Sequence, residues 1–199
     1  MKILDFETAF KYPFKNGLRM FNIFWILLPI FGWLALFGYQ IRLVKLWIKG
    51  NYSGLPKLYF GKDLSLGFWM FLKMIPLIAV IAIINVALGW IPVLGAILSV
   101  LISLFIIPIL AINFFNKETV ESSFDLDKVK FVFDNLQAYI IAVLKTIGLA
   151  IIFTVMIIIL VGIPASTFTK NIFLVDFYGR YANKTTKRRV VKKRRKKRR

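Results

Sequence analysis

The sequence predicts an all-α, polytopic helical membrane protein, because its composition is too apolar for a soluble fold. Hydrophobic residues make up 59% of the 199-residue chain, against roughly 45–50% in soluble globular proteins. Residues 74–116 carry no charged side chain, and a membrane-spanning helix needs only about 20 apolar residues. We expect four strong hydrophobic helices plus short arms, pairing as three helical hairpins. A soluble enzyme and a disordered chain are excluded.

The N-terminal region, residues 1–16, is predicted to form an interfacial amphipathic helix. Ile3, Phe6, Phe10 and Phe14 recur at helical spacing, and polar residues take the opposite face. The segment is too short and too polar to cross a bilayer. It would therefore lie in the plane of the membrane interface.

The membrane domain, residues 17–183, contains three turn signals, each with a proline that follows Ile or Leu. As a single helix, the uncharged run 74–116 would be about 65 Å long. The hydrocarbon core of a bilayer is only about 30 Å thick, so this run must fold back on itself. The residues expected at the three turns are Pro29, Gly32, Pro92, Gly95 and Pro164.

The distribution of positive charge separates two arrangements of these helices. If Pro29 and Pro164 only kink their helices, the basic loop 42–62 lies outside the cell whenever the C-terminal tail lies inside. If all three prolines mark hairpin turns, both termini and both polar loops face the cytoplasm, and Lys170 is the one cation left over. The second arrangement agrees better with the rule that cytoplasmic loops are enriched in Lys and Arg.

No catalytic or metal-binding residues and no cofactor are expected. Cysteine and histidine are both absent, so zinc and haem lose their usual ligands. Intramembrane acids usually mark ion paths, yet the only acid expected within a membrane arm is Asp176, which we expect to pair with Lys170 or Arg180. Asn85 and Asn113 are expected to form hydrogen bonds between helices.

An ordered set of short motifs resembles the domain-of-unknown-function family 4013, small multi-span membrane proteins found mainly in archaea. Lys11-Tyr12-Pro13-Phe14 precedes the first apolar segment, and Gly38-Tyr39-Gln40-Ile41-Arg42 ends it. Leu55-Pro56 follows in the loop, then Asp63 and Gly67. The chain departs from the family at Lys57 and Leu58, where acids and a Trp are usual. The motif residues without an assigned role are Tyr12, Pro13, Gly38, Tyr39, Arg42, Leu55, Pro56 and Gly67.

The resemblance implies an archaeal plasma-membrane protein and supplies no activity. Two interpretations of Gly38, Tyr39 and Arg42 remain open. They form a head-group or ligand site at the cytoplasmic interface, or they are structural, with Gly allowing close helix packing and Arg reaching the interface.

The C-terminal tail, residues 184–199, is expected to be disordered, polybasic and cytoplasmic, with Lys or Arg at 12 of its 16 positions. Near an anionic leaflet each cation contributes roughly 1 kcal/mol, and RNA phosphates would bind by counterion release. The tail has no aromatic residue, so it would not read RNA sequence. The predicted contacts to anionic lipid, or to ribosomal or other RNA, are Lys187, Arg188, Arg189, Lys192, Lys193, Arg194, Arg195, Lys196, Lys197, Arg198 and Arg199. Alternatively, the tail is only a topological anchor.

Two functions follow from these observations. The first is a non-enzymatic membrane protein that organises or tethers other components through its tail. The alternative is a small transporter, channel or membrane-insertion factor. A hydrated polar cavity near Asn85, Asn113 or Thr154 would favour the alternative, and a dry, closed bundle would favour the first.

Overall fold

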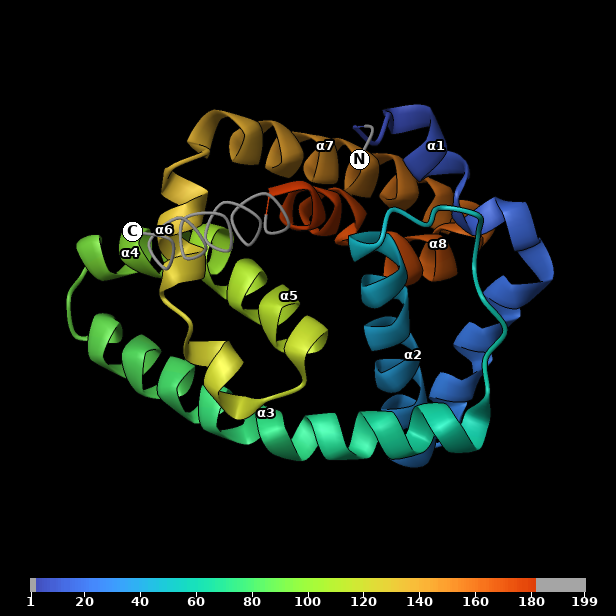
Figure 1. Ribbon diagram of the computed structural model, residues 1–199, viewed down its shortest axis with the longest axis horizontal. Helices are drawn as coiled ribbons and strands as arrows, with labels where there is room; N and C mark the ends of the chain where they lie inside the picture. The colour runs from blue at the N-terminus through green and yellow to red at the C-terminus, as the bar shows by residue number, and fades with distance from the viewer. Residues whose placement is uncertain (1–2, 182–199) are drawn as a thin grey trace, which may run out of the picture.

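The computed structural model describes residues 3–181, and all regular structure in that range is helical (Figure 1). The predicted all-α class is confirmed, and three stretches are long and apolar enough to cross a membrane: Phe60–Gly89, Leu94–Lys117 and Leu136–Ile159. The first apolar segment is divided by a turn at Pro29, as expected. The predicted tail, 184–199, lies outside the described residues.

The N-terminal part comprises α1 (Phe6–Lys11), η1 (Pro13–Leu27) and α2 (Phe31–Ile48). The Asp5 carboxylate caps α1 by accepting a hydrogen bond from the Thr8 N–H at 2.7 Å. The helix expected over 1–16 is therefore shorter, because Pro13 begins the 3₁₀-helical arm η1. At about 2.0 Å per residue, a 3₁₀-helix is longer than an α-helix of the same sequence, which extends this short arm.

The apolar face of α1 packs against the protein itself. The ring of Phe6 stacks on Phe173 with 5.7 Å between ring centroids, and Phe10 stacks on Phe153 at 5.8 Å. The aromatic face identified at the N-terminus thus covers α7 and the C-terminal helix.

The central hairpin consists of α3 (Phe60–Gly89) and a returning stretch of three continuous pieces. The returning pieces are α4 (Leu94–Leu101), the π-helical segment η2 (Ile102–Ile106) and α5 (Ile107–Lys117). Their connection lies at the left edge of the molecule in Figure 1.

The C-terminal part begins with two short elements, η3 (Val120–Phe124) and α6 (Asp127–Phe133). The long helix α7 (Leu136–Val155) follows and ends in η4 (Met156–Ile159), after which α8 (Gly162–Thr169) turns back. Residues 172–181 form a further helix.

The first two turns share one backbone geometry. Ile30 and Val93, each directly after the proline, have φ of 63° and 62°. The next N–H donates to the proline carbonyl, from Phe31 at 2.7 Å and from Leu94 at 2.6 Å. This is the hydrogen bond of a γ-turn, which reverses the chain within three residues.

Glycine is required immediately after these two turns. A Cβ on Gly32 would overlap the Trp25 carbonyl, and one on Gly95 would overlap the Leu88 carbonyl. In both hairpins the glycine follows the proline by three residues and the carbonyl precedes it by four. The structure thus places equivalent turns at Pro29 and Pro92.

The third turn does not lie at Pro164. The chain reverses at Leu160, which has φ of 61°, and Pro164 lies in the first turn of α8. A proline is tolerated in the first turn of a helix, where its missing N–H has no intrahelical acceptor. The glycine that allows close approach at this turn is Gly162, next to the Phe153 carbonyl.

Helix 172–181 lies in the middle of the molecule, alongside α7 (Figure 1). Every residue from 172 to 178 is buried, and the ring of Phe177 lies 5.2 Å from those of Phe131 and Tyr139. The membrane-spanning stretches, by contrast, are only 6%, 22% and 17% buried within the protein. Apolar surface this extensive belongs in a lipid environment, so the chain is a helical membrane protein.

Candidate functional site at the crossing of α2 and α3

Helix α2 runs across α3 (Figure 1), and two glycines set how closely the helices approach. A Cβ on Gly38 would overlap the Asp63 carbonyl, and a Cβ on Gly67 would overlap the Leu34 carbonyl. Small residues at a helix crossing let the two backbones touch. This contact places the middle of α2 beside the first two turns of α3.

A bidentate ion pair joins the two helices next to the glycines. Arg42 Nε lies 2.5 Å from Asp63 Oδ1, and Arg42 Nη2 lies 2.7 Å from Asp63 Oδ2. The Asp63 carboxylate also accepts the Tyr59 N–H at 2.8 Å, and its side chain is fully buried. Charge-assisted, bidentate geometry of this kind is the strongest hydrogen bonding available to a carboxylate.

The loop between α2 and α3 is held by the same residues. Arg42 donates to the Lys57 carbonyl at 2.9 Å, and the Tyr39 hydroxyl donates to the Pro56 carbonyl at 3.0 Å. Leu55 is fully buried, and its carbonyl accepts a hydrogen bond from Arg19 on η1. The loop is thereby tied to both arms of the first hairpin.

Six of the eight motif residues therefore meet at one junction, although their role could not be assigned from sequence. They are Gly38, Tyr39, Arg42, Leu55, Pro56 and Gly67. The guanidinium of Arg42 also lies over the rings of Tyr39 and Tyr59, at 5.5 and 5.4 Å. Since its charge is matched within the protein, this arrangement favours the structural interpretation over a head-group site.

Tyr12 and Pro13 lie apart from this junction. The Tyr12 ring is buried and meets the Trp47 ring edge-on, with 5.5 Å between ring centroids. Burial raises the pKa of the Tyr12 hydroxyl from 10.0 to about 12, because the charged form loses its hydration. Tyr12 thereby joins the N-terminal segment to the end of α2.

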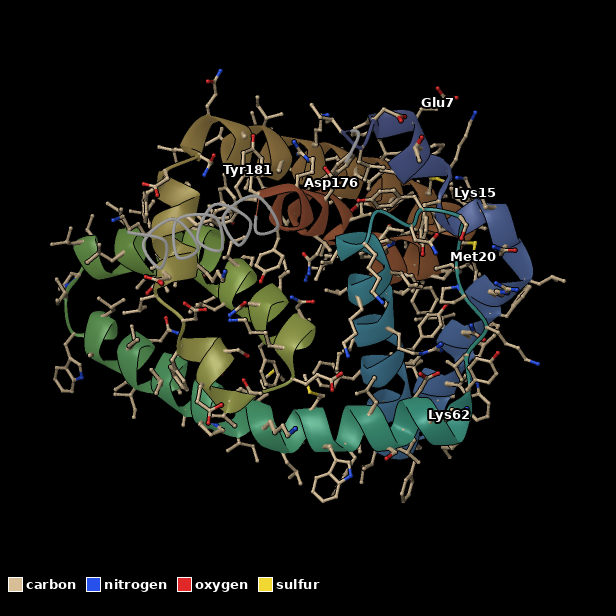
Figure 2. All side chains as sticks on the ribbon, viewed as in Figure 1. Glu7, Lys15, Met20, Lys62, Asp176 and Tyr181 are labelled. Atoms are coloured by element: carbon tan, nitrogen blue, oxygen red, sulfur yellow. The ribbon has the colours of Figure 1, made fainter. Side chains whose placement is uncertain are left out.

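A second buried carboxylate, Asp176, lies on helix 172–181 (Figure 2). It accepts hydrogen bonds from Arg180 Nε and from the Tyr52 hydroxyl, both at 2.8 Å. The expected pairing of Asp176 is therefore confirmed, with Arg180 as the partner. Burial, followed by the nearby Asp176 charge, raises the pKa of Tyr52, so this hydroxyl remains a donor.

The polar residues that would favour a transporter do not share a cavity. Asn113 is buried, donates to the Ser122 carbonyl and accepts the Tyr178 hydroxyl, each at 2.6 Å. The Thr154 hydroxyl bonds the Ala150 carbonyl of its own helix. Asn85 also bonds within its own helix, rather than between helices, and lines a cavity of about 210 Å³ at the α3–α4 turn.

A different polar cavity, which the sequence did not predict, lies between α2, α5 and α8. Its lining includes Gln40, Ser166 and Lys170. One sequence signal pointed toward it, since Lys170 is the cation that the charge distribution left unplaced. Within residues 3–181, no cluster of acidic side chains could hold a metal ion.

Comparison with known proteins adds no relative to this picture. No family model matches the chain, and no curated protein or solved structure matches it either.

Proposed function

We propose that this membrane protein is non-enzymatic and organises or tethers other components at the cytoplasmic face through its basic tail. The observation that carries the proposal is the separation of charge along the chain. Of 28 Lys and Arg residues, 12 lie in the last 16 positions, a stretch without any acid. Such an acid-free run of cations attracts anionic lipid or nucleic-acid phosphate.

The acids of the described region have little capacity to neutralise the tail. Five of the nine acidic residues already form ion pairs with Lys or Arg, and the most buried, Asp63 and Asp176, are paired with arginines. The tail begins directly after the membrane domain, so the surface nearest to it is the leaflet itself. Anionic lipid is therefore the partner we favour.

The positive-inside rule supports cytoplasmic termini. We also propose that the chain belongs to family 4013, a resemblance that implies a plasma-membrane location. Transport receives less support, because Asn113 is enclosed by hydrogen bonds and Thr154 bonds its own helix. The small cavity beside Asn85 lies at the α3–α4 turn and not along a path between the helices.

Removing residues 184–199 tests the proposal. The shortened protein should still insert, since the long apolar helices drive insertion, but it should lose binding to phosphatidylglycerol vesicles. In the full chain this binding should weaken steeply with salt, because interactions between exposed charges are screened within about 10 Å at 0.1 M.

A matched control keeps the tail composition and shuffles its order, and it should bind like the natural tail because charge alone is used. RNA of unrelated sequences forms a second arm, in which tight binding to RNA but not to vesicles would reassign the partner. Vesicle and RNA binding that survives loss of the tail would show that the tail is only an anchor.

A further inference from the structure

A polar pocket of about 390 Å³ lies between α2, α5 and α8 and is partly open to the surface, where Lys170 and Asn171 are exposed. This volume falls within the range of small-molecule sites, roughly 300–1,000 Å³. The polar residues that line it are Gln40, Trp47, Ser166, Thr167, Lys170 and Asn171.

One face of α2 is devoted to this cavity. Gln40, Leu43, Val44 and Trp47 all line it, at the spacing that places residues on one side of a helix. The α3-facing side carries Arg42 and the junction described above. Helix α2 therefore separates a closed ion pair from an open polar space.

Four of the polar side chains around this pocket have no partner among the described residues. The side chains of Gln40, Ser166, Lys170 and Asn171 form no hydrogen bond or ion pair with any residue in the range 3–181. Lys170 and Asn171 are exposed, and Gln40 and Ser166 are half-buried, so their donors are free to bind a ligand that enters from the surface.

The charge of the cavity selects the sign of that ligand. Lys170 supplies a positive charge, and no acidic residue is in the lining. Helix 172–181 starts directly after Asn171, whose carbonyl accepts the Val175 N–H. The free N–H groups of a helix start favour an anion, and the lining side chains offer further donors.

We propose that this cavity binds a phosphate group, carried by an anionic phospholipid or by free inorganic phosphate. Leu43, Val44 and Phe115 form an apolar wall beside the donors, which suits a lipid head group with its glycerol. The site is independent of the tail and goes beyond the tethering function.

The test uses the full chain in neutral detergent, with native mass spectrometry to count bound phosphatidylglycerol, phosphatidylcholine or inorganic phosphate. Lys170→Gln should weaken phosphatidylglycerol binding by at least about tenfold, the effect of losing one charged hydrogen bond. Gln40→Leu should weaken it less. The matched control is Lys130→Gln, which removes one exposed cation from α6 and should leave the affinity unchanged.

The outcomes separate the two sources of phosphate. Phosphatidylglycerol binding without inorganic phosphate binding identifies the lipid, and binding of both identifies the phosphate group alone as sufficient. Equal affinities in the wild type and Lys170→Gln overturn the proposal. Equal losses in Lys170→Gln and Lys130→Gln also overturn it, because they indicate general attraction by net charge. If the C-terminal tail binds neither vesicles nor RNA, the prediction for this pocket still holds, because the residues that line it lie outside the tail.

Discussion

At the scale of single residues, two buried carboxylates organise the loop between α2 and α3. Asp63 and Asp176 each combine an arginine with one further donor, the Tyr59 N–H and the Tyr52 hydroxyl respectively. Removing such charges from water costs several kcal/mol per ion unless their hydrogen bonds are satisfied. The two sites therefore act as fixed points for the chain around them.

Replacing Asp63 by Asn should leave Arg42 without its counter-charge and lower the free energy of unfolding by about 3–5 kcal/mol. Unfolding in mixed micelles with increasing denaturing detergent measures the change. The control is Glu7→Gln, which breaks the exposed ion pair between Lys11 and Glu7 and should have little effect. Equal losses in the two variants would contradict a structural role for the buried pair.

The raised pKa of Tyr12 predicts that the folded protein loses stability at alkaline pH. Its pKa is about 12 in the folded protein and 10.0 in an unperturbed chain. Below pH 10 both states keep the proton, whereas above it the unfolded chain loses the proton first and gains stability. Each pH unit between these values should therefore cost the folded state about 1.4 kcal/mol.

The measurement is the free energy of unfolding at several values from pH 9 to 12, for the wild type and Tyr12→Phe. The other tyrosines remain in both proteins, so the difference between the two curves isolates Tyr12. Parallel curves would show that Tyr12 is not protected from ionisation.

At the scale of elements, glycine controls the approach of helices and the shape of turns. Gly38→Ala should push α2 away from the Asp63 carbonyl and destabilise the protein by about 1–3 kcal/mol, as overpacked sites do. The matched control is Gly61→Ala in the same helix pair, where nothing lies within 4 Å of the added Cβ.

Because alanine favours a helix over glycine by about 1 kcal/mol, the Gly61 variant should be slightly more stable than the wild type. The two substitutions should thus have opposite signs in the same unfolding assay. A Gly38 variant as stable as the Gly61 variant would show that the helices separate without cost.

Two of the three turns could be located from sequence, and the reason is physical. Around Pro92 the uncharged run is too long for one crossing, and Pro29 has the same Pro-to-Gly spacing. The third turn occurs at Leu160, and leucine carries no local signal for positive φ. The nearby Pro164 was the expected turn residue, and in the structure it lies in the first turn of α8.

The core helix 172–181 could not be predicted for a related reason. Asp176 made this segment resemble a short charged arm of a membrane hairpin rather than a core helix, because a local pattern does not reveal a partner 124 residues away in Tyr52. In the same way, the motifs identified Arg42 and Asp63 separately, while their pairing required the crossing at Gly38. A hydropathy pattern does not show that a charge is neutralised by a residue far away in the sequence.

At the scale of the whole molecule, apolar surface and charge occupy different parts of the chain. The three membrane-spanning stretches expose most of their residues, and the basic residues gather in the loop 42–62 and in the tail. The hairpin arrangement predicts that these basic segments share the cytoplasmic side. The turns between the paired arms then face outward.

Single cysteines test this sidedness cleanly, because the natural chain has none. Cysteines at Asn51, Glu121 and Thr185 should resist a membrane-impermeant thiol reagent in intact cells and react after the cells are opened. A cysteine at Trp90, which is 84% exposed at the α3–α4 turn, should react in intact cells. The alternative with four crossings places the loop 42–62 outside and predicts labelling at Asn51 with protection at Thr185. Labelling at Asn51 would therefore reject the three-hairpin arrangement, since Pro29 would then lie within a crossing segment rather than at a turn.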